Sequence, residues 1–342
     1  MFTKSDLKLW SILSVIFLLI CIQTNLKAQD AVSFNKLGKK YLIDGDYSNA
    51  ESMLYSAYKL DTSNLTYIND LSLCLYLEKE FEKALQIIQP VTDSSGSGND
   101  QSFQIAGSIY LGLRRYAACE ELYKRGLSFF PDNGALNNEM GELLFMQNRS
   151  DCIQYWEKGI EKDPSYAKNY YNATKFYGNR NEYLWSVIYG EIYVNIDPYG
   201  SKTAEIKDII LKSYQNLFND LLTNGFKKDK NNFFEKVISI FFKQKTNTVN
   251  GLSVNSLTMI RTGFILDWYD VKPEKYPFHL FEFQRQLLRD GLFEAYNQWL
   301  FGTTENLSAF QSWTQLHNQE YTELTKFLKS NLYKVPIGQY YQ

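Results

Sequence analysis

The chain has 342 residues, of which 44% are hydrophobic and 22% are charged, an ordinary composition for a folded protein of one elongated domain or two compact ones. Its 36 Lys and Arg residues nearly balance 38 Asp and Glu residues, so the formal net charge is only -2. This balance excludes the basic surface typical of nucleic-acid-binding proteins, and we expect no nucleic-acid partner.

Residues 1–28 have the pattern of a secretory signal peptide. Lys4 and Lys8 precede an almost wholly apolar segment over 9–22, and a polar stretch leads to Ala28. A basic start, an apolar core of about 7–15 residues and a small residue at the cut are typical of such peptides. We expect cleavage after Ala28 and export to the periplasm or cell envelope, with no transmembrane segment afterwards. The alternative is an uncleaved N-terminal anchor.

From about Val32 to Pro198 the sequence repeats with a period near 34 residues. Prolines mark this period at Pro131, Pro164 and Pro198. Two columns of small or compact residues share it: Ala50, Ala84, Cys119, Cys152 and Ser186 in one, and Gly38, Ser72, Gly107, Gly141 and Thr174 in the other. Self-similarity at this period indicates stacked supersecondary units.

The pattern resembles the tetratricopeptide repeat (TPR), in which each unit is a pair of antiparallel helices. The third unit matches the family pattern best, with Phe103, Ala106, Gly107 and Tyr110, then Tyr116, Cys119, Tyr123, Gly126 and Pro131. Small residues let helix backbones approach closely, and proline ends the second helix. The resemblance implies an all-α, TPR-like helical-hairpin solenoid of about five repeats over 29–200.

Three cysteines remain after the expected cleavage: Cys74, Cys119 and Cys152. An odd number, spread through the array, does not form a disulfide framework. Cys119 and Cys152 stand in the alanine column, where a small hydrophobic side chain packs one helix on the next. A lipid anchor on Cys21 is a weaker alternative, because Ile20 stands where a lipidation motif has a small residue.

The resemblance also implies a concave groove lined by the first helix of each unit, and such a groove suits a protein or peptide partner. The groove candidates are rich in amides and tyrosines and are of mixed charge. They are Asn35, Lys39, Asn69, Leu73, Tyr76, Gln101, Gln104, Ser108, Asn138, Glu142, Tyr171 and Lys175. A merely solvated face is the alternative for each of them. The family's chaperone-tail clamp is absent, since Asp70, Gln101 and Ile105 occupy its basic and amide positions.

Residues 201–342 lose the 34-residue period but keep helical patterns. Apolar residues at helical spacing predict helices over 204–224, 232–242, 252–269, 280–300 and 306–333, the last two separated at 302–304. We expect these helices to form an all-α bundle that caps the last repeat. Residues 276–301 resemble the tail of some exported Bacteroidetes repeat proteins, a resemblance that implies no activity.

The sequence offers little for catalysis. It has two histidines, His279 and His317, and no metal-ligand cluster or phosphate-binding glycine loop, so we expect no cofactor. Four carboxylates lie in neighbouring predicted helices of the C-terminal region: Asp267, Asp270, Glu282 and Asp290. The leading hypothesis is an exported, non-enzymatic scaffold. The alternatives are a small enzymatic or glycan-handling module in the C-terminal region and a self-assembling array of stacked solenoids.

Overall fold

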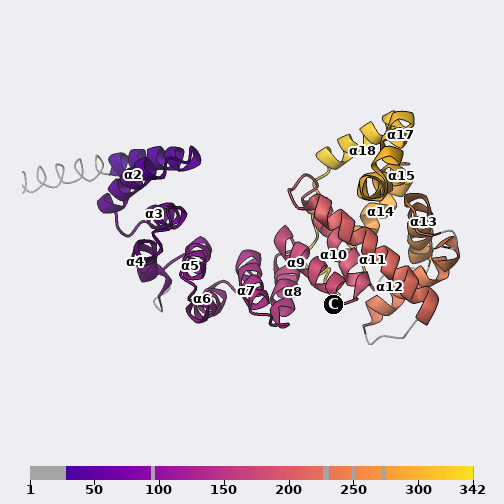
Figure 1. The fold of residues 1–342 in the computed structure, drawn as a ribbon, viewed down its shortest axis with the longest axis horizontal. Helices are drawn as coiled ribbons and strands as arrows, with labels where there is room; N and C mark the ends of the chain where they lie inside the picture. Colours follow the sequence, from indigo (N-terminus) through magenta and orange to yellow (C-terminus); the bar gives the residue numbers. More distant parts are fainter. Residues whose placement is uncertain (1–27, 94–96, 226–230, 249–250, 271–274, 342) are drawn as a thin grey trace, which may run out of the picture. The chain divides into compact units, whose positions relative to one another are not determined.

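The structure is a computed structural model that describes residues 28–93, 97–225, 231–248, 251–270 and 275–341. The described residues form helices and no strand, and successive helices pack as hairpins in the all-α, TPR-like manner predicted from the sequence (Figure 1). The chain divides into two compact units, one ending at Pro131 and the other beginning at Asp132. The predicted signal peptide lies, but for its last residue, outside the described residues.

The first unit is a run of helical hairpins. A helix over 28–43 leads into this run. The helices that follow are α2 (Tyr47–Leu60), α3 (Leu65–Leu77), α4 (Phe81–Thr92), α5 (Asp100–Gly112) and α6 (Tyr116–Phe129). Each helix packs on the next, and α3 also contacts α5, which is how first helices of successive units meet in a solenoid.

The second unit opens with the same arrangement. Its first helices are α7 (Gly134–Met146), α8 (Cys152–Lys162), α9 (Ala167–Asn179), α10 (Tyr183–Ile196) and α11 (Thr203–Asn224). Helix α11 packs on α10 and also contacts α9, as α9 packs on α8 and also contacts α7. Helix α11 therefore takes the place of the first helix of a further unit, although the proline and glycine columns have ended before it.

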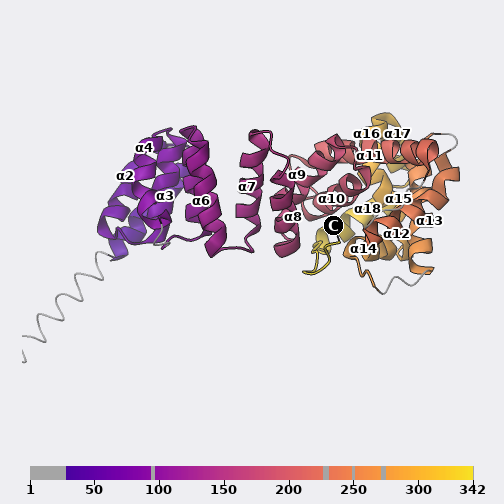
Figure 2. The ribbon, with the colours of Figure 1, turned by 90° about the horizontal axis from the view of Figure 1, so that it is seen from below.

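The remaining helices form a bundle beside α10 and α11 (Figure 2). They are α12 (Asn232–Lys243), the 3-10 helix η1 (Gln244–Thr248), α13 (Val254–Asp270), α14 (His279–Arg289), α15 (Phe293–Asn297), the π-helix η2 (Gln298–Gly302), α16 (Thr303–Glu305), α17 (Leu307–Leu316) and α18 (Asn318–Ser330). None of the helices in the described part of the chain has the length and hydropathy that crossing a bilayer requires.

The prediction that the chain ends in a pair of long helices was wrong. Helix α14 ends at Arg289 because Gly291 takes a left-handed conformation, with φ at 71°. The predicted break at 302–304 is instead helical. The next helix, α17, begins after the N-cap residue Asn306, whose side chain accepts a hydrogen bond from the Ala309 backbone N–H at 3.0 Å. Residues 331–341 form no helix.

The small-residue columns are buried where helices approach one another. Ala50, Ala84, Cys119 and Cys152 are fully buried, and all three described cysteines are free thiols. A Cβ atom on Gly107 would lie 2.1 Å from the Tyr123 hydroxyl oxygen. At Gly107 the facing Tyr123 ring therefore leaves no room for a side chain.

Candidate functional site

In the first unit, groove candidates connect the first helices of successive repeats. The Asn35 side chain, on helix 28–43, donates a hydrogen bond to Asp70 Oδ2 of α3 at 2.9 Å, and Lys39 Nζ lies 3.7 Å from the same oxygen. Asn69 of α3 donates to Asn99 Oδ1 at 3.1 Å and accepts from Ser102 Oγ at 2.8 Å. These buried amides tie neighbouring repeats together.

The other candidates of the first unit lie along the same helix faces. Gln104 and Ser108 are half-buried and bond back along α5, to the carbonyls of Asp100 at 3.5 Å and Gln104 at 3.1 Å. Leu73 and Tyr76 are also half-buried, whereas Gln101 is exposed. Contact of any of these residues with a partner stays a prediction.

In the second unit, the polar face runs across α7, α9 and α11. The Asn172 amide donates to Asn138 Oδ1 at 2.8 Å and to Glu142 Oε1 at 3.1 Å. The Tyr171 hydroxyl donates to Glu205 Oε2 at 3.0 Å, and Lys175 Nζ donates to Glu205 Oε1 at 2.8 Å. We call Glu142, Tyr171, Asn172, Lys175 and Glu205 the polar face. Its members are half-buried or half-exposed, whereas Asn138 is fully buried.

Sequence reasoning missed two members of this face. Glu205 lies 34 residues after Tyr171, and Asn172 lies 34 residues after Asn138. Both follow the repeat period from predicted candidates. Extending the period one unit beyond Pro198 would have found Glu205.

Charge on this face is set by its neighbours. Burial, with the nearby Glu142 carboxylate, raises the pKa of Glu139 to about 7. The bond from Lys175 lowers the pKa of Glu205. The Glu139 carboxyl, on α7 beside the polar face, is therefore partly protonated at neutral pH.

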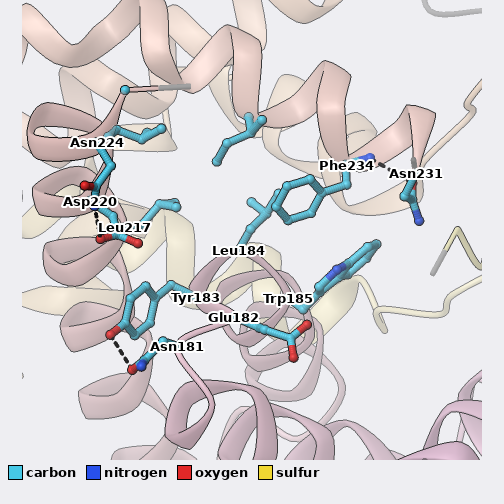
Figure 3. A pocket seen from close by; sticks show the side chains of 13 residues that line it. Asn181, Glu182, Tyr183, Leu184, Trp185, Leu217, Asp220, Asn224, Asn231 and Phe234 are labelled. Carbon is cyan, nitrogen blue, oxygen red and sulfur yellow. Dashed lines mark hydrogen bonds between the residues drawn. The ribbon is translucent and has the colours of Figure 1, made fainter. Parts of the chain in front are cut away.

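A pocket of about 350 Å³ lies between α10, α11 and α12 (Figure 3). Trp185 and Phe234 form an aromatic wall, and the carboxylates of Glu182 and Asp220 also line it. Two other polar side chains of its lining bond residues close by in sequence: Tyr183 donates to Asn181 Oδ1 at 2.6 Å and Asn224 donates to Asp220 Oδ1 at 3.1 Å. The pocket also borders Gly225 and Asn231, which flank a segment that the structure does not describe.

Three of the four carboxylates of the alternative hypothesis have separate local partners. Asp267 Oδ2 accepts from the Gln244 amide at 3.1 Å, Asp290 accepts from Gln286 at 2.8 and 2.9 Å, and Glu282 lies 3.9 Å from the His279 ring. Across the described ranges, no group of three or more His, Cys, Asp or Glu side chains is placed to hold a metal ion. The carboxylate hypothesis therefore gains no support from the described geometry.

Solved structures of helical repeat proteins align with about half of the chain. YrrB, a TPR protein with an unusual peptide-binding site, aligns over 55% of this chain and 96% of its own at 16% identity, with a TM-score of 0.38. PilF of Pseudomonas aeruginosa aligns over 58% of this chain and 94% of its own at 15% identity, with a TM-score of 0.46. The TPR2AB domain of yeast Sti1 aligns over 54% of this chain and 98% of its own, at 15% identity and a TM-score of 0.26.

At the level of sequence, no family profile matches the chain, and no curated protein matches it. The structural similarity covers about half of the chain. At these low sequence identities it concerns the fold alone. Over that half, the chain has an all-α fold similar to that of TPR proteins.

Proposed function

We propose that this protein is an exported, non-enzymatic scaffold that binds a protein or peptide partner through the polar face of α7, α9 and α11. The observation that carries the proposal is the chain of hydrogen bonds along this face. Asn172 bonds Glu142 on α7, and Tyr171 bonds Glu205 on α11. These bonds hold donors and acceptors in fixed positions before a partner arrives, which lowers the entropic cost of binding.

The chemistry of the face favours a partner that presents backbone amides or a basic side chain. Three of its members carry charge: Glu142, Lys175 and Glu205. Since the Lys175 and Glu205 side chains are 40% and 38% exposed, each still has hydrogen-bonding capacity toward solvent. An extended peptide or a helix laid across the three helices would meet acceptors on α7 and α11 and donors on α9.

The test is a crosslinking capture in cells with two matched double variants. Glu142→Ala with Lys175→Ala alters the polar face, and Gln154→Ala with Lys158→Ala alters exposed positions of α8. A partner captured by the wild type and the α8 variant, and lost from the polar-face variant, supports the proposal. Equal thermal unfolding of the two variants is the control for folding. Equal capture by both would place recognition elsewhere on the molecule.

Export is part of the proposal, and it rests on the pattern of residues 1–28. Cell fractionation and the mass of the mature protein test it. A chain that begins at Gln29 and is released with the periplasmic or envelope fraction is the expected result. A full-length chain that stays in the membrane fraction would favour the uncleaved anchor instead.

A further inference from the structure

The last described residues of the chain form an extended tail that packs back onto the repeats. After α18 the tail covers residues 331–341, without helix. Both ribbon views place its end beside α10 (Figures 1 and 2). Leu332 and Ile337 are 79% and 80% exposed, whereas Tyr333 is buried and Tyr340 and Tyr341 are half-buried. The tail is therefore attached through a few side chains, with exposed segments between them.

Tyr341 makes most of the contacts at the tail's end. Its ring stacks on Phe233 of α12 with centroids 4.6 Å apart and meets Tyr276 edge-on at 5.4 Å. Its hydroxyl donates to the Pro277 carbonyl at 2.6 Å, and its own carbonyl accepts from the Asn231 amide at 2.6 Å. One residue is thus held by its ring, its hydroxyl and its backbone.

The two residues before it complete the attachment. The His279 backbone N–H donates to Gln339 Oε1 at 2.5 Å. Tyr340 lies beside Glu157 of α8, and burial raises the pKa of its hydroxyl. Residues 339–341 line a small hollow together with Ile160 of α8 and Trp185 and Ile188 of α10. We call this hollow, with Asn231, Phe233 and Pro277, the tail groove.

We propose that the tail groove accepts the tail of a second copy of the chain, so that two chains exchange tails and form a dimer. Every copy carries both the groove and the segment that fits it. An exchanged tail makes the same ring contacts and the same hydrogen bonds as the chain's own tail. Exchange of an identical element is a low-cost route to dimers because it introduces few new contacts.

The geometry of the tail permits this exchange. Tyr333 is buried against Phe283, so the eight residues 334–341 can extend about 26 Å beyond it, and Ile337 among them is exposed. Gly338 has a φ of 88°, so the chain turns there, directly before the residues that dock. The chain's own tail competes for the groove at a local concentration on the order of millimolar. Exchange is therefore expected to depend strongly on protein concentration.

A labelled peptide with the sequence of residues 331–341 tests the groove. We expect it to bind the full-length Tyr341→Ala chain at least tenfold more tightly than the wild type, in fluorescence anisotropy, because the variant's own tail competes less. Ile337→Ala, at an exposed tail position, should behave as the wild type does. A peptide carrying Tyr341→Ala should not bind. A folded Tyr341→Ala chain, or a Gln339→Ala chain as a second test, that binds no better than the wild type would overturn the proposal.

A complementation experiment tests the second copy as the occupant. Asn231→Ser weakens the groove but keeps the helix cap, since Ser is also a good N-cap residue. A tagged Tyr341→Ala chain offers an open groove, and an untagged Asn231→Ser chain offers an intact, loosened tail. The untagged Asn231→Ser chain should co-purify with the tagged Tyr341→Ala chain in a larger amount than an untagged copy of either variant does with a tagged copy of the same variant. Peptide binding without this excess recovery would overturn exchange between copies.

Discussion

Glu191 of α10 and Arg261 of α13 form an ion pair in which each side chain is only 1% exposed. The Glu191 Oε1 atom also accepts hydrogen bonds from the Gln284 amide at 2.7 Å and from the Tyr296 hydroxyl at 3.0 Å. The Arg261 guanidinium also donates to Asn297 Oδ1. One carboxylate on the last predicted repeat helix is thereby bonded to three helices of the C-terminal bundle.

Removing one partner of this pair should destabilise the second unit strongly. Arg261→Met leaves the Glu191 charge buried without its cation, and breaking a buried pair in this way costs about 3–5 kcal/mol. The double variant Arg261→Met with Glu191→Leu removes both charges and should recover much of the loss. Urea unfolding followed by circular dichroism measures both. A single variant within 1 kcal/mol of the wild type would show that the pair carries little of the stability.

The repeat architecture was readable from sequence because it is periodic. Successive units place a small residue where a bulky side chain of the partner helix packs, as Gly38 does against Leu54, Gly107 against Tyr123 and Gly141 against Trp156. The Glu191–Arg261 pair has no such signal, because its members lie 70 residues apart and outside the repeat columns. Periodicity identifies contacts between equivalent positions only. Docking of a non-repeating bundle depends on individual side chains.

The candidate site was only partly readable for a related reason. The repeat period predicts which residues lie on the groove side of the first helices. It does not predict how deeply each of them is buried. Asn69 and Asn138 are 2% and 0% exposed, because their amides bond the neighbouring first helix. Half-exposed Asn172 and Glu205 complete the polar face. How deeply a side chain is buried depends on how neighbouring units stack. The sequence pattern of one unit carries no information about that stacking.

Lys207 should make a contribution to stability that rises with pH above neutrality. This side chain of α11 is buried, its Nζ donates to the Trp299 carbonyl at 2.7 Å, and burial lowers its pKa to about 7. An unfolded lysine titrates near 10.4, so between about pH 7 and 10 the unfolded chain binds more protons. The free energy of unfolding then increases by at most about 1.4 kcal/mol per pH unit.

Lys207→Met removes this titration and provides the check. The stability of the variant relative to the wild type should be highest at pH 7 and below and should fall as the pH rises toward 10. Urea midpoints at pH 7 and 9 measure the difference. Lys212→Met, at an exposed position of the same helix, is the matched control and should leave the slope unchanged. A Lys207→Met slope equal to that of the wild type would refute the assignment.

Gly141 should not tolerate even a methyl group. A Cβ atom there would lie 2.3 Å from Nε1 of the buried Trp156 ring. Alanine favours a helix by about 1 kcal/mol over glycine, but overpacking costs about 1–3 kcal/mol. We expect Gly141→Ala to lower the free energy of unfolding by about 1 kcal/mol net. Met146→Ala, exposed on the same helix, is the comparison in thermal unfolding, and a stabilised Gly141→Ala chain would contradict the packing argument.

The buried thiols should be inert in the folded protein. Burial raises the pKa of Cys74 to about 12 and that of Cys152 to about 11, and the thiolate is the reactive form. Iodoacetamide at pH 8 should leave both unmodified in the native chain and alkylate both in urea. Peptide mass spectrometry distinguishes the two states. Rapid native modification would mean that these helices open readily.

The hairpin turns offer a route to higher stability. Lys79, at the turn between α3 and α4, has a φ of 65°, and a left-handed conformation costs a non-glycine residue about 1–2 kcal/mol. Glycine avoids this strain but loses about 0.5–1 kcal/mol in entropy. We therefore expect Lys79→Gly to stabilise the first unit by about 0.5–1 kcal/mol.

Lys83→Gly, four residues later inside α4, should instead destabilise it by about 1 kcal/mol. Asn148, with a φ of 58° at an equivalent turn, should gain less from glycine because asparagine tolerates this conformation. Urea unfolding of the three variants measures the order, and a Lys79→Gly chain no more stable than Lys83→Gly would show that the turn is not strained.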